Sequence, residues 1–103
     1  MGGISRSRGI GYERELVNFL KEAGLHAQRV PLSGATDYAK GDVEVTPGYD
    51  RDAAPLVGEC KRKRSLPDWL TSALGENDFA AFREDRGETL IVIRAGLFRD
   101  LLQ

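Results

Sequence analysis

The apolar positions follow a helical period near the start of the chain. From Tyr12 to Ala23 they fall on one stripe, with Phe19 and Leu20 between them. Apolar residues spaced three or four apart are typical of an amphipathic helix. Gly24 follows the last of them, and glycine is a common residue at a helix end. The pattern therefore predicts one helix that ends before this glycine.

Further along, the pattern changes to short strands and short helices. Alternating or continuous apolar runs predict strands at 26–30, 42–45, 56–61 and 89–94. Helical spacing and end signals predict helices at 66–74, 78–85 and 97–103. The resulting order, α-β-β-β-α-α-β-α, predicts an α/β fold in which helices flank a mixed β-sheet. We expect a single small domain over 10–103, preceded by a flexible basic N-terminal arm over 1–9.

Polar residues occur at positions of the predicted strands where alternation fixes their direction. Asp42 and Glu44 share one face of their strand, and Glu59 and Lys61 share one face of the next, opposite Cys60. If the two strands pair as a hairpin, then Asp42, Glu59 and Lys61 converge on one side. Carboxylate oxygens suit Mg²⁺ or Mn²⁺, and a lysine beside them can stabilise charge on a phosphate. The alternative is a cross-strand salt bridge on an exposed sheet face.

The first predicted helix carries a carboxylate on its apolar side. At about 100° per residue, Glu13 falls between Leu20 and Val17, whereas Arg14 and Glu15 fall outside the apolar arc. A carboxylate that points inward needs a partner, since burying it alone costs several kcal/mol. That partner is either a buried arginine or a backbone amide, or else a metal ion or a metal-bound water.

Composition narrows the class of protein. The chain has 103 residues, of which 41% are hydrophobic and 30% are charged, as expected for a soluble globular domain. No apolar run approaches the roughly 18 residues of a membrane span, and the first residues lack the apolar core of a signal peptide. Cys60 is the single cysteine, which favours a reducing, intracellular setting.

Charge is distributed unevenly, although the net charge is only -1. Residues 1–64 carry 11 Lys/Arg against 9 Asp/Glu, and residues 65–103 carry 4 against 7. The first part ends in the basic run Lys61–Arg64. Such a run is either a track for a polyanion such as DNA or an ordinary solvated surface.

Four segments of the sequence together resemble a known family. They are "GIGYEREL", "RVPLSG", "GDVEV" and "GECKRKR", which occur in this order between Arg8 and Arg64. Their order and spacing are similar to those of the archaeal-type, Hjc-like Holliday junction resolvases, which also occur in viruses and phages. "GDV…GECK" resembles the motif of the wider PD-(D/E)xK nuclease superfamily, with Gly41 in place of the usual proline. The resemblance implies a restriction-endonuclease-like fold.

The resemblance also implies a role for individual residues. Glu13 would hold a metal ion through water, Asp42 and Glu59 would bind it directly with help from the Cys60 carbonyl, and Lys61 would be the catalytic lysine. Ser33 would lie near the scissile phosphate. The residues implied to contact the DNA backbone are Arg6, Arg8, Arg14, Arg62, Lys63 and Arg64. One or two Mg²⁺ ions per site are implied, with Mn²⁺ as a substitute.

The favoured function is that of an endodeoxyribonuclease that makes paired symmetric nicks in four-way DNA junctions by hydrolysis with metal-activated water. Its partners would be branched DNA and a second copy of the chain, with no membrane and no small-molecule substrate. Its location would be the cytoplasm, or the host cytoplasm if the protein is phage-encoded. Two alternatives stay open: a related nuclease that acts on flaps, nicks or forks, and a DNA-binding module without activity.

Overall fold

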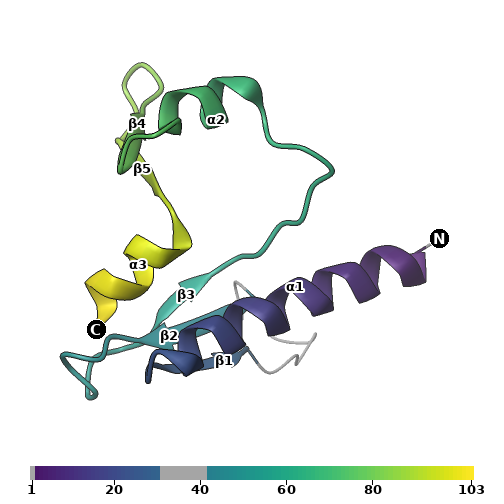
Figure 1. Ribbon diagram of the computed structural model, residues 1–103, viewed down its shortest axis with the longest axis vertical. Coiled ribbons are helices and arrows are strands. Elements are labelled where there is room, and N and C mark those ends of the chain that lie inside the picture. The colour runs from purple at the N-terminus through teal and green to yellow at the C-terminus, as the bar shows by residue number, and fades with distance from the viewer. Residues whose placement is uncertain (1, 31–41) are drawn as a thin grey trace. The chain divides into compact units, whose positions relative to one another are not determined.

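The computed structural model describes the backbone of residues 2–30 and 42–103, and the side chains of these residues from Gly11 onward. It divides into two compact units. Unit 1 comprises Met1–Arg62 together with Leu102–Gln103, and unit 2 comprises Lys63–Leu101. Figure 1 labels the helices and strands of both units.

Unit 1 begins with the long helix α1, Gly2–Glu22. The backbone N–H of Gly24 donates to the Lys21 carbonyl over 2.9 Å, and Gly24 itself has a φ of 86°. The predicted helix end is therefore confirmed, because this left-handed backbone favours glycine. The start was predicted too late, since the helical pattern was followed only from Tyr12 and the helix starts at Gly2. A helix that is already nucleated extends at a modest cost of about 1 kcal/mol per glycine.

The sheet of unit 1 packs against α1 (Figure 1). Its three antiparallel strands lie in the order β1-β2-β3, namely His26–Arg29, Val43–Thr46 and Leu56–Gly58. Strand β2 alternates between buried and half-buried residues, as its sequence predicts. The buried residues of unit 1 come from α1, the turn that follows it, β2 and the end of the chain: Val17, Leu20, Leu25, Val43, Val45 and Leu102. This core holds α1 firmly over the sheet.

The end of the chain returns to unit 1. The backbone N–H of Gly48 donates to the Leu102 carbonyl over 2.6 Å, and Gln103 Nε2 donates to the Ala23 carbonyl over 3.1 Å. Gly48 allows this close approach, because a Cβ there would lie 3.2 Å from both the Leu102 oxygen and Leu25 Cδ2. The last two residues thus close the core built by α1 and β2.

Unit 2 contains the remaining elements, apart from the last residue of α3. They are α2 (Asp68–Leu74), β4 (Phe79–Phe82), β5 (Leu90–Ile93) and α3 (Ala95–Leu102). The helix predicted at 78–85 is wrong, because Phe79–Phe82 forms an antiparallel pair with Leu90–Ile93. Alanines at positions 80 and 81 favour a helix locally. Pairing with a β-branched strand overrides that preference.

The α/β class is confirmed, with three helices and two antiparallel sheets among the described residues. The sequence predicted one mixed sheet, whereas these strands pair only with close neighbours along the chain. Strands that follow one another along the chain can pair antiparallel without a crossover connection.

Candidate functional site

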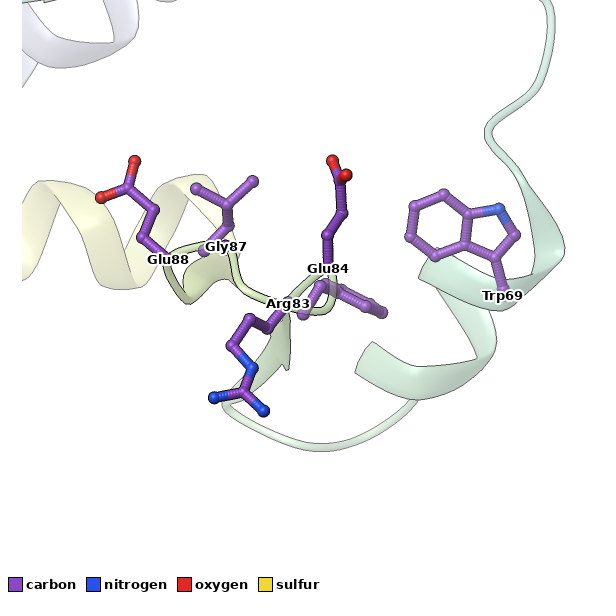
Figure 2. Close-up of a pocket in the computed structure, with 7 residues that line it drawn as sticks. Trp69, Arg83, Glu84, Gly87 and Glu88 are labelled. Atoms are coloured by element: carbon purple, nitrogen blue, oxygen red, sulfur yellow. The ribbon is translucent and has the colours of Figure 1, made fainter.

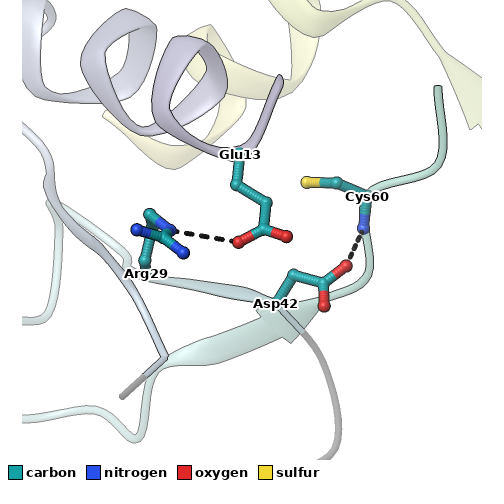
Figure 3. A network of polar contacts seen from close by, with 4 residues as sticks. All are labelled: Glu13, Arg29, Asp42 and Cys60. Atoms are coloured by element: carbon teal, nitrogen blue, oxygen red, sulfur yellow. Dashed lines mark hydrogen bonds and ion pairs between the residues drawn. The ribbon is translucent and has the colours of Figure 1, made fainter. Parts of the chain in front are cut away.

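Helix α1 presents Glu13 to the sheet of unit 1. Arg29, the last residue of β1, donates from Nε to Glu13 Oε1 over 3.1 Å (Figure 3). The side chain of Glu13 is 17% exposed and that of Arg29 is 34% exposed. The inward direction predicted for Glu13 is therefore confirmed. Of the partners that the sequence left open for Glu13, the structure contains an arginine, Arg29.

Asp42 is fixed directly before β2 by three hydrogen bonds. Its backbone N–H donates to the Gly58 carbonyl over 2.8 Å, and its carbonyl accepts from the Val30 N–H over 2.9 Å. Its side chain accepts at Oδ2 from the backbone N–H of Cys60 over 2.8 Å (Figure 3). This carboxylate is therefore tied to the segment that follows β3.

Cys60 connects the three candidate carboxylates electrostatically. The pKa of its thiol is raised above the ordinary value by partial burial first, and then by the charges of Asp42, Glu13 and Glu59. All three negative charges therefore act on one half-buried sulfur atom. Cys60 was expected in the core, on the face opposite Glu59. It is half-buried and not part of the core, while Glu59 and Lys61 on either side of it are exposed. The strand predicted at 56–61 ends at Gly58.

Glu59 and Lys61 lie on the surface directly after β3. Lys61 Nζ is 3.7 Å from Glu59 Oε2. The side chain of Lys61 is 69% exposed and that of Glu59 is 61% exposed. The ion pair thus joins residues of one segment, and it does not cross between strands. Among residues 2–30 and 42–103, no set of three His, Cys, Asp or Glu is gathered closely enough to hold a metal ion.

The other predicted site residues have different positions. Ser33 lies outside the described residues. Arg6 and Arg8 belong to the first turns of α1, and Arg14 is exposed on the same helix. The basic residues after β3, Arg62, Lys63 and Arg64, are all exposed. Arg62 belongs to unit 1, whereas Lys63 and Arg64 belong to unit 2.

Two residues near the site were not predicted from the sequence. Arg29 binds Glu13, and the strand alternation of 26–30 could have placed it toward α1 together with Ala27. Tyr12 lines a cavity of about 410 Å³ with Gly11, Glu15 and Arg62. From the sequence, Tyr12 was expected only to contribute to the apolar stripe of the helix.

Unit 2 has a cavity of its own, of about 540 Å³. Trp69 of α2 lines it and contacts Phe82 of β4 edge to face, with ring centroids 5.0 Å apart. Figure 2 shows Glu84 and Glu88 pointing to one side, away from Arg83. Two carboxylates at the rim make this cavity a poor site for a DNA phosphate.

No helix among the described residues combines the length and the apolar character that crossing a membrane requires. Searches of curated proteins and of solved structures each found no match.

A comparison with protein-family models identifies the class of protein: the chain is a crossover junction endonuclease. The matching model is described as "Archaeal holliday junction resolvase (hjc)" and covers residues 4–96. The chain belongs to this family, and its function is that of a Holliday junction resolvase. The family resemblance predicted from the sequence is therefore confirmed. Nucleases of this family are metal-dependent, and their substrate is the four-way DNA junction.

Proposed function

We propose that this resolvase hydrolyses the junction strands at a metal site formed by Glu13, Asp42 and Glu59, with Lys61 beside it. The observation that carries the proposal is the hydrogen bond from the Cys60 N–H to Asp42 Oδ2, which ties Asp42 to the segment that carries Glu59 and Lys61. Like charges brought together without a functional reason would destabilise the fold. A site that binds a divalent cation gains from the same arrangement.

The carboxylate oxygens fit a hard cation. Glu13 uses Oε1 to bind Arg29, and Asp42 uses Oδ2 to bind the Cys60 N–H. Within the described part of the chain, the second oxygen of each carboxylate has no hydrogen bond, so each can serve as a ligand. Mg²⁺ prefers such oxygens and keeps several waters, which suits a site with few protein ligands. Glu59 is exposed, so it would turn inward to complete the set.

The residues around the carboxylates position them. Arg29 holds Glu13 toward the sheet, and the Cys60 N–H fixes the rotamer of Asp42. Lys61 extends from the surface on a long, exposed side chain, so its ammonium group can reach a phosphate and stabilise the charge that develops there. When bound, a divalent ion supplies Lewis-acid stabilisation and makes water a stronger nucleophile.

Further details of the proposal rest on family membership. We propose one or two Mg²⁺ ions per site with Mn²⁺ as a substitute, a position for Ser33 near the scissile phosphate, and a restriction-endonuclease-like frame for the described elements. A homodimer would place two sites on one junction and so produce paired symmetric nicks. The DNA backbone would be bound by arginines and lysines of α1 and of the segment after β3: Arg6, Arg8, Arg14, Arg62, Lys63 and Arg64.

The test is cleavage of three end-labelled DNAs, a four-way junction, a flap and a duplex, each with Mg²⁺ and with EDTA. Asp42→Asn should lower the cleavage rate at least about 100-fold, because a neutral amide is a poor ligand for the ion. It should leave junction binding largely intact, since the asparagine oxygen can still accept from Cys60. Asp78→Asn, at an exposed position in unit 2, is the matched control and should cleave normally.

Two outcomes would contradict the proposal. Cleavage by Asp42→Asn at the wild-type rate would remove Asp42 from the metal site. Equal cutting of the flap, the duplex and the junction would contradict the proposed structure-selective pair of nicks.

A further inference from the structure

The cavity of unit 1 that Tyr12 lines is built by the same two segments that carry Glu13 and Glu59. Gly11, Tyr12 and Glu15 of α1 line it together with Arg62, and its volume is about 410 Å³. Tyr12 directly precedes Glu13, and Arg62 follows Cys60 by two residues. Two residues of chain span at most about 7 Å, so the backbone of Arg62 lies within that distance of Cys60, whose N–H binds Asp42.

The lining supplies the three kinds of group that a single nucleotide requires. The half-buried ring of Tyr12 offers an apolar face for stacking on a base. The exposed guanidinium of Arg62 matches the geometry of a phosphate. Glu15 accepts hydrogen bonds, and the amino groups of adenine, cytosine and guanine can donate them. Within the described residues, neither Glu15 nor Arg62 forms an ion pair, so both are available to a ligand.

We propose that this cavity, the Tyr12 pocket, holds one unstacked nucleotide of the junction strand next to the scissile phosphate. Tyr12 stacks on the base, Arg62 binds its phosphate, and Glu15 accepts from its amino group. The volume lies within the range of about 300–1,000 Å³ that is usual for small-ligand sites. The crossover of a four-way junction interrupts continuous stacking, so a base is removed from the stack there at least cost.

Tyr12 is then a specificity-determining residue for the reaction. Plain duplex DNA keeps its bases stacked, and filling the pocket from a duplex would cost the full unstacking energy. The pocket therefore favours the junction over the duplex during binding, before any bond is cut. This inference rests on the proposed function, since it needs the DNA strand at Glu13 and Asp42.

The test is a double-mutant cycle between the protein and the DNA. Affinities are measured by fluorescence anisotropy without divalent ions, in the cleavage-deficient Asp42→Asn protein. Junctions carry an abasic residue at each of three positions on either side of the cut. At one position, Tyr12→Ala and the abasic residue should each weaken binding roughly 5- to 100-fold, with no further loss when combined. Tyr12→Phe keeps the stacking ring and should lose less than about threefold.

A second variant blocks the pocket without removing the ring. Gly11 lines the pocket, and a Cβ there would meet nothing within 4 Å. A larger side chain therefore fits without a clash and fills part of the pocket. Gly11→Leu should weaken junction binding as much as Tyr12→Ala does, while its better helix propensity protects the fold. Gly11→Ala shares the gain in propensity and adds only a methyl group, so its loss should be clearly smaller.

Tyr49→Ala is the control for loss of a tyrosine, because Tyr49 is 71% exposed in the turn after β2 and lines no part of the pocket. Its binding should match that of the parent protein. Additive losses from Tyr12→Ala and the abasic residue at every position would overturn the pocket proposal. So would wild-type affinity in Gly11→Leu.

The two proposals fail in different ways. If Asp42→Asn stops cleavage and the cycle shows no coupling, the metal site stands and the Tyr12 pocket is wrong. If Asp42→Asn still cleaves, the metal site is wrong, whatever the binding cycle shows.

Discussion

The two units bury their apolar residues to very different extents, although each combines helix with antiparallel sheet. Unit 1 has a three-stranded sheet whose valines face α1, and most of the buried residues belong to it. In unit 2, Ala80 is buried, whereas Phe79, Leu90 and Ile91 are each more than half exposed. A two-stranded hairpin with the seven-residue helix α2 has little surface with which to build a core.

The charged side chains also have more defined partners in unit 1 than in unit 2. In unit 1, the half-buried Glu13 has a defined arginine partner, and Asp42 is bound by a backbone N–H. In unit 2, Arg83, Glu84 and Glu88 are exposed around a cavity. The difference teaches that polar side chains obtain defined partners where a well-packed core supports them, as it does in unit 1.

The largest effect should come from the core of unit 1. Leu20 is 1% exposed, so Leu20→Ala should lower the free energy of unfolding by about 2–5 kcal/mol through lost burial and a residual cavity. Leu90→Ala, at a residue 60% exposed in unit 2, should cost about 0.5 kcal/mol or less. Urea unfolding followed by circular dichroism measures both changes. Equal losses would break the comparison.

A smaller effect should follow from removing the partner of Glu13. Arg29→Met leaves a half-buried carboxylate without its ion pair and should cost about 1–2 kcal/mol, reduced by the partial exposure of both groups. Arg83→Met in unit 2 removes an exposed arginine and should change stability by less than about 0.5 kcal/mol. Adding Glu13→Gln to Arg29→Met should recover part of the loss in the same urea assay. If the double variant lost more free energy of unfolding than Arg29→Met and Glu13→Gln lose in sum, this account would be contradicted.

The smallest effect concerns the thiol of Cys60, whose pKa is raised by burial and by the three carboxylates. Alkylation by iodoacetamide should therefore reach half its maximal rate above pH 9.0, the ordinary thiol pKa. Asp42→Asn removes one of the charges, so it should lower that midpoint while leaving the larger contribution of burial.

The raised pKa also fixes the sign of a stability effect. The folded state favours the neutral thiol. The stability that depends on this neutral thiol is therefore fully present below the pKa of the thiol in the unfolded chain, and it is lost as the pH rises through the raised pKa of the folded protein. Cys60→Ser should remove this loss in urea unfolding above pH 9.0. Identical pH profiles for the two proteins would exclude a thiol contribution.

Local patterns predicted those parts of the fold in which one face is buried. The alternation of Val43 and Val45 located β2, and the apolar arc of α1 placed Glu13 inward, because burial imposes a strict period on both elements. Residues 78–85 were predicted wrongly because alanine favours a helix locally, whereas the strand here is stabilised by the pairing of Ala80 with Val92 on the next strand, which the pattern within 78–85 does not contain.

The site was predictable to a similar extent. Glu13 and Asp42 follow from periodicity, and the charges of both raise the pKa of the Cys60 thiol. The half-buried position of Cys60 was not predicted, because β3 ends at Gly58 and so leaves Cys60 outside the core. Arg29 was missed because an ion pair between α1 and β1 depends on how the helix packs on the sheet, which no local pattern contains.

The two hydrogen bonds that bring Leu102 and Gln103 back to unit 1 have a kinetic consequence. The contact of Gln103 with Ala23 spans 80 residues, so it closes a ring of chain that contains all of unit 2. Closing a long ring lowers the entropy of the chain before the contacts that it allows have formed, so these hydrogen bonds should form late in folding. Because that entropy grows only with the logarithm of ring length, the segment between Arg62 and Leu102 can gain residues at little thermodynamic expense.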